Sequence, residues 1–178
     1  MASPVHYDPV AKTLHWLMAA LIIGLWCVGL STEALPKGDL RSQVIGLHKA
    51  FGVVVLALVV IRLAWRATHL APELPGSMPP MERLGAKLGH LALYGLMVAL
   101  PLDGILMSQT AGRPVNVFGL TLPTILDKNE ALKGVFGLGH EVLAWVLAVV
   151  LVVHVAAALR HHWVLKDEIM RRMLPTRS

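Results

Sequence analysis

Charged residues are scarce in this sequence. Asp, Glu, Lys and Arg make up only 15% of its 178 residues, while 56% are hydrophobic. A water-soluble domain of this length needs more polar surface, so the composition favours a chain that lies in a lipid bilayer. The formal net charge is +5, but the basic residues are spread between apolar runs and form no dense basic stretch. We therefore expect membrane lipid as a partner and no nucleic acid.

Cysteine is almost absent, since Cys27 is the only one. A single cysteine excludes both a disulfide framework and a thiolate metal site, and we expect Cys27 to be a small buried hydrophobic residue. A cleavable signal peptide is also not expected. Residues 1–12 contain His6 and Asp8, and no small-residue cleavage site follows the first apolar run. That run is therefore predicted to remain as a transmembrane helix.

Long apolar runs are the main feature that is present. Four of them are long enough to cross about 30 Å of hydrocarbon at about 1.5 Å per residue. They predict an all-α fold, an integral membrane four-helix bundle that forms one domain over residues 1–178. The apolar connection before the last span is expected to lie against the membrane surface or to cap the bundle. The predicted spans are residues 13–32, 44–62, 86–109 and 136–162.

Basic residues are distributed unevenly between the two sides of this bundle. Four spans place both termini on one side, and Lys and Arg outnumber Asp and Glu there but only equal them on the other side. Because cytoplasmic flanks carry the excess of Lys and Arg, we expect both termini to be cytoplasmic. The basic residues on the side of the termini include Arg62, Arg66, Arg83, Arg160 and Arg171.

Histidine is common for so apolar a chain, with nine residues. His6 and His69 lie in polar flanks and are expected to be ordinary surface residues. Others lie in or at the edges of the spans, where an ionisable side chain is costly to bury and therefore indicates a function. These histidines are His15, His48, His90, His140 and His154.

The spacing of His140 and His154 indicates what that function is. They lie fourteen residues apart on the predicted fourth helix. At about 100° per residue their side chains point within about 40° of each other, and about 21 Å of helix separates them. One metal ion cannot bind both. The spacing suits two haems, one near each face of the bilayer, each taking one axial ligand from this helix.

The partner ligands follow from depth in the membrane. His48 opens the second span at the level of His140, and His15 opens the first span at the level of His154. The predicted pairs are therefore His48/His140 around an outer haem and His15/His154 around an inner haem. Imidazole on both sides of the iron leaves no open position, which favours electron transfer over oxygen binding.

Three further side chains are expected near the inner haem. Arg62 lies fourteen residues after His48 and is suited to pair with a haem propionate. His90 either replaces His15 as the inner ligand or donates a hydrogen bond to a quinone carbonyl. His161 either serves the same quinone or is an interfacial residue. Small residues near the ligands are expected to let a porphyrin approach, namely Gly46, Gly52, Gly137 and Gly139.

Four segments of the chain resemble the four helices of bacterial cytochrome b561, and together they span nearly the whole sequence. These segments are KTLHWLMAALI, HKAFGVVVLALVVIRLAWR, KLGHLALYGLMVALPLDGILM and GHEVLAWVLAVVLVVHVAAALRHHW. The resemblance implies a protein of the bacterial inner membrane that binds two haem b groups. The axial ligands that it implies are His15, His48, His140 and His154, the same four that depth predicts.

The same resemblance implies an activity. Members of the family include a superoxide oxidase, which takes electrons from superoxide at the periplasmic side and reduces ubiquinone. Its quinone contacts correspond to His90 and His161 here. Cations at the outer rim, such as Lys49 beside His48, would attract the superoxide anion. Asp103 departs from the family pattern, which has an uncharged residue there. Asp103 either takes up protons or, as we expect, reaches the membrane interface.

Two other functions compete with a superoxide:ubiquinone oxidoreductase. A membrane-anchor cytochrome would use the same haems to pass electrons between quinone and a partner subunit, such as a dehydrogenase or hydrogenase. A transporter would instead use the histidines to bind a metal ion or relay protons. Haem absorption in the purified protein separates the transporter from the two cytochromes. The sequence singles out no catalytic residue beyond the proposed ligands and quinone contacts.

Overall fold

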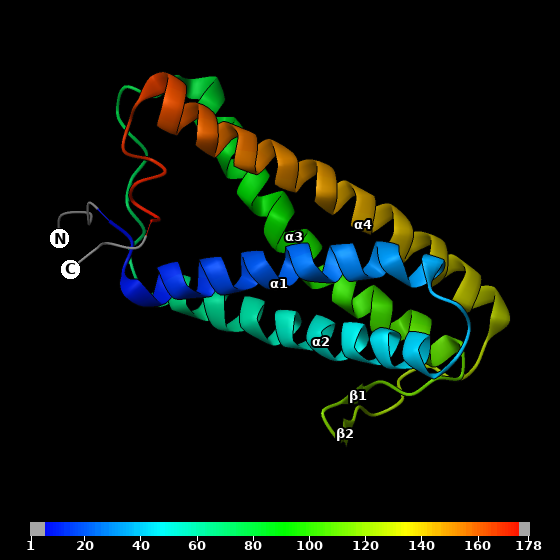
Figure 1. Cartoon of the computed structure of the whole chain (residues 1–178). Coiled ribbons are helices and arrows are strands. Elements are labelled where there is room, and N and C mark those ends of the chain that lie inside the picture. Colours follow the sequence, from blue (N-terminus) through cyan, green and yellow to red (C-terminus); the bar gives the residue numbers. More distant parts are fainter. Residues whose placement is uncertain (1–5, 175–178) are drawn as a thin grey trace.

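Four long helices and one short hairpin make up the computed structural model, which describes residues 6–174 (Figure 1). α1 runs antiparallel to α2, and α4 runs antiparallel to α3. α1 begins and α4 ends at the same end of the bundle, which we call the terminal end; the opposite end is the far end. The elements are α1 Pro9–Ala34, α2 Asp39–Thr68, α3 Pro80–Thr110, β1 Asn116–Val117, β2 Leu120–Thr121, α4 Glu130–Leu159 and the π-helix η1 Arg160–Leu165.

The helices confirm the predicted all-α membrane bundle. Each of the four, with α4 and η1 counted as one, is long and apolar enough to cross a membrane. They extend beyond most predicted spans, and polar side chains cap the first turns of α1 and α4. Asp8 accepts a hydrogen bond from the Ala11 amide at 3.0 Å, and Asn129 accepts one from the Leu132 amide at 3.0 Å. Residues 160–162 of the last predicted span lie in η1.

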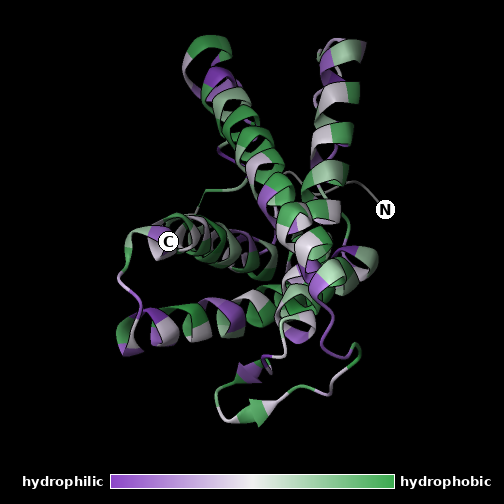
Figure 2. Cartoon of the chain, turned by 90° about the vertical axis from the view of Figure 1, so that its right-hand side faces the viewer, coloured by the Kyte–Doolittle hydropathy of each residue, from purple (hydrophilic) through white to green (hydrophobic). Residues whose placement is uncertain are grey.

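Hydrophobic residues run along the length of the helices (Figure 2), and many of them are exposed on the outside of the bundle. The buried core is small and joins α1, α2 and α3 through Met18, Val59 and Met97. The expectation that Cys27 is buried is wrong, because its side chain is exposed on α1. In a membrane protein an exposed apolar residue contacts lipid, so hydrophobicity alone does not tell an inward position from an outward one.

The closest helix packing joins α1 to α2, α2 to α3 and α3 to α4. α4 meets the first two helices through rings. Trp26 of α1 contacts Trp145 of α4, with ring centroids 5.4 Å apart. The other ring contacts of α4 with α1 and α2 involve histidines. The space between the α1/α2 pair and α4 is therefore bridged by aromatic and imidazole side chains.

Gln109 attaches the connection between α3 and α4 to the far end of the bundle. Its buried side-chain amide donates to the Pro123 carbonyl at 2.9 Å and accepts from the Ile125 amide at 3.0 Å. These hydrogen bonds satisfy backbone groups of a segment that has few of its own. Gln109 therefore holds this apolar connection against the bundle at the far end.

The β1–β2 hairpin is held against α2. Its two-residue turn places Phe118 and Gly119 at φ values of 51° and 96°, as in the tight turns that match strand twist. Phe118 packs on Phe51 of α2, with ring centroids 5.4 Å apart. Lys49 donates to Ser108 Oγ and to the Pro114 carbonyl, both at 3.2 Å. The ammonium group of Lys49 thus fastens this connection to α2.

Candidate haem sites

The structure brings four of the predicted histidines together as two pairs, one toward each end of the bundle. His15 of α1 faces His154 of α4, with ring centroids 6.2 Å apart and ring planes at 60°. His48 of α2 faces His140 of α4, with centroids 6.3 Å apart and planes at 71°. Within residues 6–174 no group of three or more His, Cys, Asp or Glu side chains could hold a metal ion. Each pair therefore joins a histidine of α4 to a histidine of α1 or α2.

These two separations fit bis-histidine ligation of one iron. A metal–imidazole bond is about 2 Å long, and the ring centroid lies about 1 Å behind the nitrogen, so two rings on opposite sides of one iron have centroids about 6 Å apart. His90 also lies beside His154, but their centroids are only 5.6 Å apart. The His15/His154 pair fits this separation better than the His90/His154 pair.

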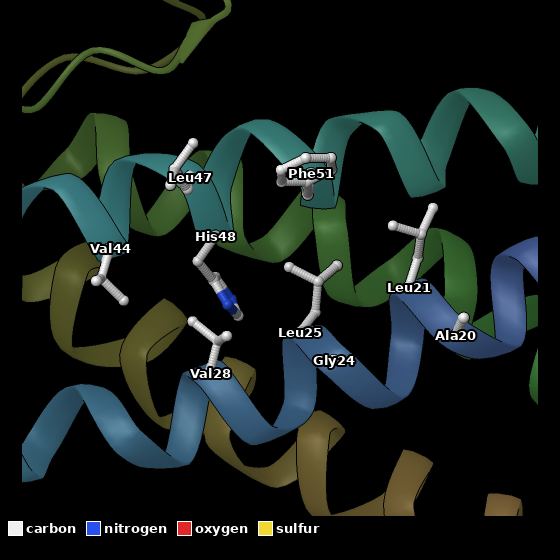
Figure 3. A pocket seen from close by; sticks show the side chains of 9 residues that line it. All are labelled: Ala20, Leu21, Gly24, Leu25, Val28, Val44, Leu47, His48 and Phe51. Carbon is white, nitrogen blue, oxygen red and sulfur yellow. The ribbon is translucent and has the colours of Figure 1, made fainter.

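His48 points from α2 into an apolar groove against α1 (Figure 3). The groove has a volume of about 340 Å³. Gly29 of α1 leaves room for the ring, because a Cβ at this position would lie 3.5 Å from His48 Cε1. The other side chains around the groove are apolar, which suits the hydrophobic face of a porphyrin. They include Leu21, Leu25, Val28, Val44 and Phe51.

His140 lies against α3 close to Gly104. A Cβ at Gly104 would lie 3.0 Å from His140 Cε1 and 3.3 Å from Nδ1, which is closer than ordinary van der Waals contact. Asp103 precedes this glycine, and its Oδ2 lies 3.5 Å from His140 Nδ1. The Asp103 side chain is only 14% exposed. The expectation that Asp103 reaches the interface is therefore wrong, because it faces inward.

Unpaired polar atoms mark the far-end site. His48 Nδ1, His140 Nδ1 and Asp103 Oδ2 are buried and have no hydrogen-bond partner among residues 6–174. Buried polar groups without partners are rare and costly, and they are most often found where a protein binds something. An imidazole that coordinates a metal through Nε2 carries its proton on Nδ1, where a nearby acceptor then orients the ring.

Arg62 lies beside the terminal-end pair. Its Nη2 lies 3.1 Å from His15 Nδ1, and its Nε donates to the Tyr94 hydroxyl at 3.1 Å. An arginine can only donate, so this contact requires His15 Nδ1 to accept and its proton to sit on Nε2. Coordination through Nε2 would move that proton to Nδ1. Arg62 would then be a cation free to pair with a carboxylate, which agrees with its predicted role toward a propionate.

His161 has an acidic partner at the terminal end. Its Nδ1 lies 2.5 Å from Asp167 Oδ2, and η1 carries His161 toward this carboxyl group. Burial alone would raise the pKa of Asp167, but hydrogen bonds from the Ile169 amide and from His161 outweigh it and lower the pKa. Asp167 is thus an anion that fixes the orientation of the His161 ring.

His6 and His69 lie outside these sites. His6 is exposed, and His69 is an exposed residue that stacks on Trp65 with centroids 3.7 Å apart. A Cβ at Gly46, Gly52 or Gly137 would have no neighbour within 4 Å, so space is open beside these glycines and their expected role toward a porphyrin stays a prediction. The glycines that do adjoin the histidines, Gly29 and Gly104, were missed. For the contact between Gly104 and His140, the one signal in the sequence was that Gly104 directly follows Asp103.

A four-helix membrane bundle with a pair of facing histidines toward each end defines a membrane cytochrome of the b type. A model of the prokaryotic cytochrome b561 family matches residues 6–176. The chain belongs to this family, whose members bind haem b and carry electrons across the membrane.

Curated relatives cover nearly the whole chain. It is 36% identical over 174 residues to cytochrome b561 homolog 2 of Escherichia coli K12, covering 97% of this chain and 93% of that protein. It is 29% identical over 169 residues to a probable superoxide oxidase CybB of Yersinia pestis, covering 95% and 96%. It is 27% identical over 176 residues to cytochrome b562 of Cereibacter sphaeroides, covering 96% of each.

Proposed function

We propose that this protein holds two haem b groups and oxidises superoxide at the far end while reducing ubiquinone at the terminal end. Two superoxide anions, one ubiquinone and two protons give two molecules of oxygen and one ubiquinol. The observation that carries the proposal is that α4 supplies one histidine to each of two pairs with equal ring separation, 6.2 and 6.3 Å.

Four side chains would bind the two irons. His48 and His140 would hold one haem, and His15 and His154 the other. Bound haem supplies a one-electron couple at each end of the bundle, and two imidazole ligands leave no iron position open to oxygen. Arg62 would neutralise a propionate at the terminal end. Apolar walls, such as the groove beside His48, exclude water from the porphyrin.

The far end offers positive charge for an anionic donor. Lys49 follows His48 directly, and its ammonium group bonds the carbonyl of Pro114, which follows the exposed Arg113. The two cations also act on each other electrostatically, so both contribute to the positive charge at the far end. Local positive charge raises the encounter rate of a small anion such as superoxide. The relation to a probable superoxide oxidase supports this choice of donor.

The terminal end offers groups that handle protons. The Asp167 carboxylate accepts from His161 Nδ1, and when the ring carries a proton on both nitrogens His161 Nε2 would donate to a quinone carbonyl and deliver its proton there. His90 lies beside His154 and is the second proposed quinone contact. A basic flank of the cytoplasmic type adjoins this end, so we assign both termini to the cytoplasm and the far end to the periplasm of a bacterial inner membrane.

Haem content tests the proposed ligands. H140A and H154A should each leave about one haem per chain, whereas the wild type should hold two. The two variants should also lose different components of the reduced-minus-oxidised absorption spectrum. H69A, which alters an exposed histidine away from both pairs, is the matched control and should keep both haems. Retention of two haems by H140A would contradict the pairing.

Stopped-flow mixing with superoxide tests the reaction. Purified protein in detergent should be reduced by superoxide, and added ubiquinone should accelerate superoxide consumption and yield ubiquinol. H161A should slow ubiquinol formation while the haems are still reduced by superoxide. If superoxide fails to reduce the haems, the donor is wrong, although the two-haem arrangement would still stand on its own test.

A further inference from the structure

Asp103 is the acidic side chain that adjoins the far-end histidine pair. Its Oδ2 lies 3.5 Å from His140 Nδ1, and neither buried atom has a hydrogen bond of ordinary geometry among the residues that the structure describes. The Leu100 backbone of α3 also interacts with the His140 ring, so Asp103 and this backbone group are the two acceptors near it. The distance from Oδ2 to Nδ1 is a few tenths of an ångström longer than a hydrogen bond. A small movement of either side chain therefore gives each atom the partner that it lacks.

Two glycines let this acid and this histidine approach each other. A Cβ at Gly139 would lie 2.9 Å from Asp103 Oδ1, and a Cβ at Gly104 would lie 3.0 Å from the His140 ring. Any larger residue at position 139 would displace the carboxyl group, and any larger residue at position 104 would displace the imidazole. The contact between α3 and α4 is therefore built around the Asp103–His140 pair.

We propose that Asp103 is a positioning residue that accepts a hydrogen bond from His140 Nδ1 and thereby lowers the reduction potential of the far-end haem. The inference rests on the proposed ligation by His140. A carboxylate acceptor fixes the imidazole ring and makes it a stronger electron donor to the metal. Electron donation by the ligand favours ferric over ferrous iron, and second-shell hydrogen bonds are an established means of tuning haem potential.

The terminal-end pair has a neighbour of the opposite sign. Arg62 lies beside His15, with its Nη2 3.1 Å from His15 Nδ1. In the haem-bound protein Arg62 would turn from Nδ1 to a propionate, so a cation would stay near the terminal-end pair, whereas the far end has a carboxylate. A nearby positive charge favours the state that carries the additional electron. Asp103 and Arg62 therefore act in opposite senses on the two sites. Their combined effect makes electron transfer from the far end to the terminal end downhill.

Redox titration of the purified holoprotein tests this role. D103N keeps the shape of the side chain but makes it a weaker hydrogen-bond acceptor, so this variant should raise the reduction potential of the far-end haem. D103L removes the acceptor altogether and should raise that potential further. The terminal-end haem should keep its potential in both variants. E141Q is the matched control, because it removes an exposed acid next to His140 in the sequence and should leave both potentials unchanged.

Electron paramagnetic resonance supplies a second measurement. The ferric signal of the far-end haem should change in D103N, because its shape reports the electron donation and orientation of the axial imidazoles. Unchanged potential and signal in D103N would overturn the inference, and so would an equal shift in E141Q, which would indicate a general effect of charge. If D103L does not fold, D103N still decides. Retention of both haems by H140A would instead refute the ligation on which the inference depends.

Discussion

Replacement of Gly104 by alanine tests how tightly α3 holds the His140 ring. The added Cβ would lie 3.0 Å from Cε1, whereas carbon atoms in contact prefer about 3.5–4.0 Å. His140 must therefore move by about half an ångström or α3 must move away from α4. Overpacking of this kind typically costs about 1–3 kcal/mol, which corresponds to a loss of about 5- to 150-fold in an equilibrium constant.

Two other glycines give a graded comparison. A Cβ at Gly29 would meet His48 Cε1 at 3.5 Å, an ordinary contact, and a Cβ at Gly95 of α3 would meet nothing within 4 Å. Haem loss should therefore be large for G104A, small for G29A and absent for G95A. G95A should also stabilise α3 slightly, since alanine favours a helix over glycine by about 1 kcal/mol.

The assay is the haem-to-protein ratio of each variant after purification in detergent, followed by dissociation of haem to an excess of an apo-acceptor. G104A should lose the far-end haem faster than the wild type while the terminal-end haem stays bound. The reasoning about His140 would be refuted if G104A held two haems and released them at the same rates as G95A.

Further predictions concern pH, helix capping and the far-end loop. Burial alone would raise the pKa of Asp167, but hydrogen bonds from a backbone amide and from His161 outweigh burial and lower the pKa. The Asp167 carboxylate therefore stabilises the fold fully above the ordinary carboxyl pKa near 4. This stabilisation is lost as the pH falls through the lowered pKa. D167N should therefore make the melting temperature less dependent on pH at the acid end. D8A removes the cap of α1 and should cost about 0.5–2 kcal/mol in thermal unfolding, whereas D8N should retain most of it. Q109L leaves backbone groups of the loop unpaired and should accelerate tryptic cleavage at Lys128, measured by mass spectrometry.

The sequence was sufficient for the four spans and for the arrangement of the histidines. Hydropathy predicts where the membrane-spanning helices lie, because the bilayer determines both their length and their composition. The fourteen-residue interval between His140 and His154 predicts that both side chains lie on one face of the helix, because the number of residues per turn is constant. The family is confirmed by comparison with known proteins. The assignment of individual ligands stays a prediction, which the haem content of the variants tests.

The rotation of each helix about its axis could not be predicted. Asp103 was expected at the interface and Cys27 inside, yet Asp103 faces His140 and Cys27 is exposed. In a soluble protein the apolar face identifies the interior, but helices in lipid are apolar on all sides, so the pattern carries little information about rotation. Packing sets that rotation, and it depends on contacts such as Gly104 against His140 that join distant parts of the chain.

The single helix that supplies a histidine to both pairs has a consequence for rate and for evolution. In the proposed two-haem arrangement, the distance between the redox centres would follow from the fourteen-residue interval between His140 and His154 on α4 and not from a loop. Tunnelling between the centres depends steeply on that distance, so the internal transfer rate should stay constant among relatives while the loops at either end diverge. The surfaces that meet the electron donor and the electron acceptor can then change independently. The same two histidine pairs on α4 can thus serve partners of different kinds.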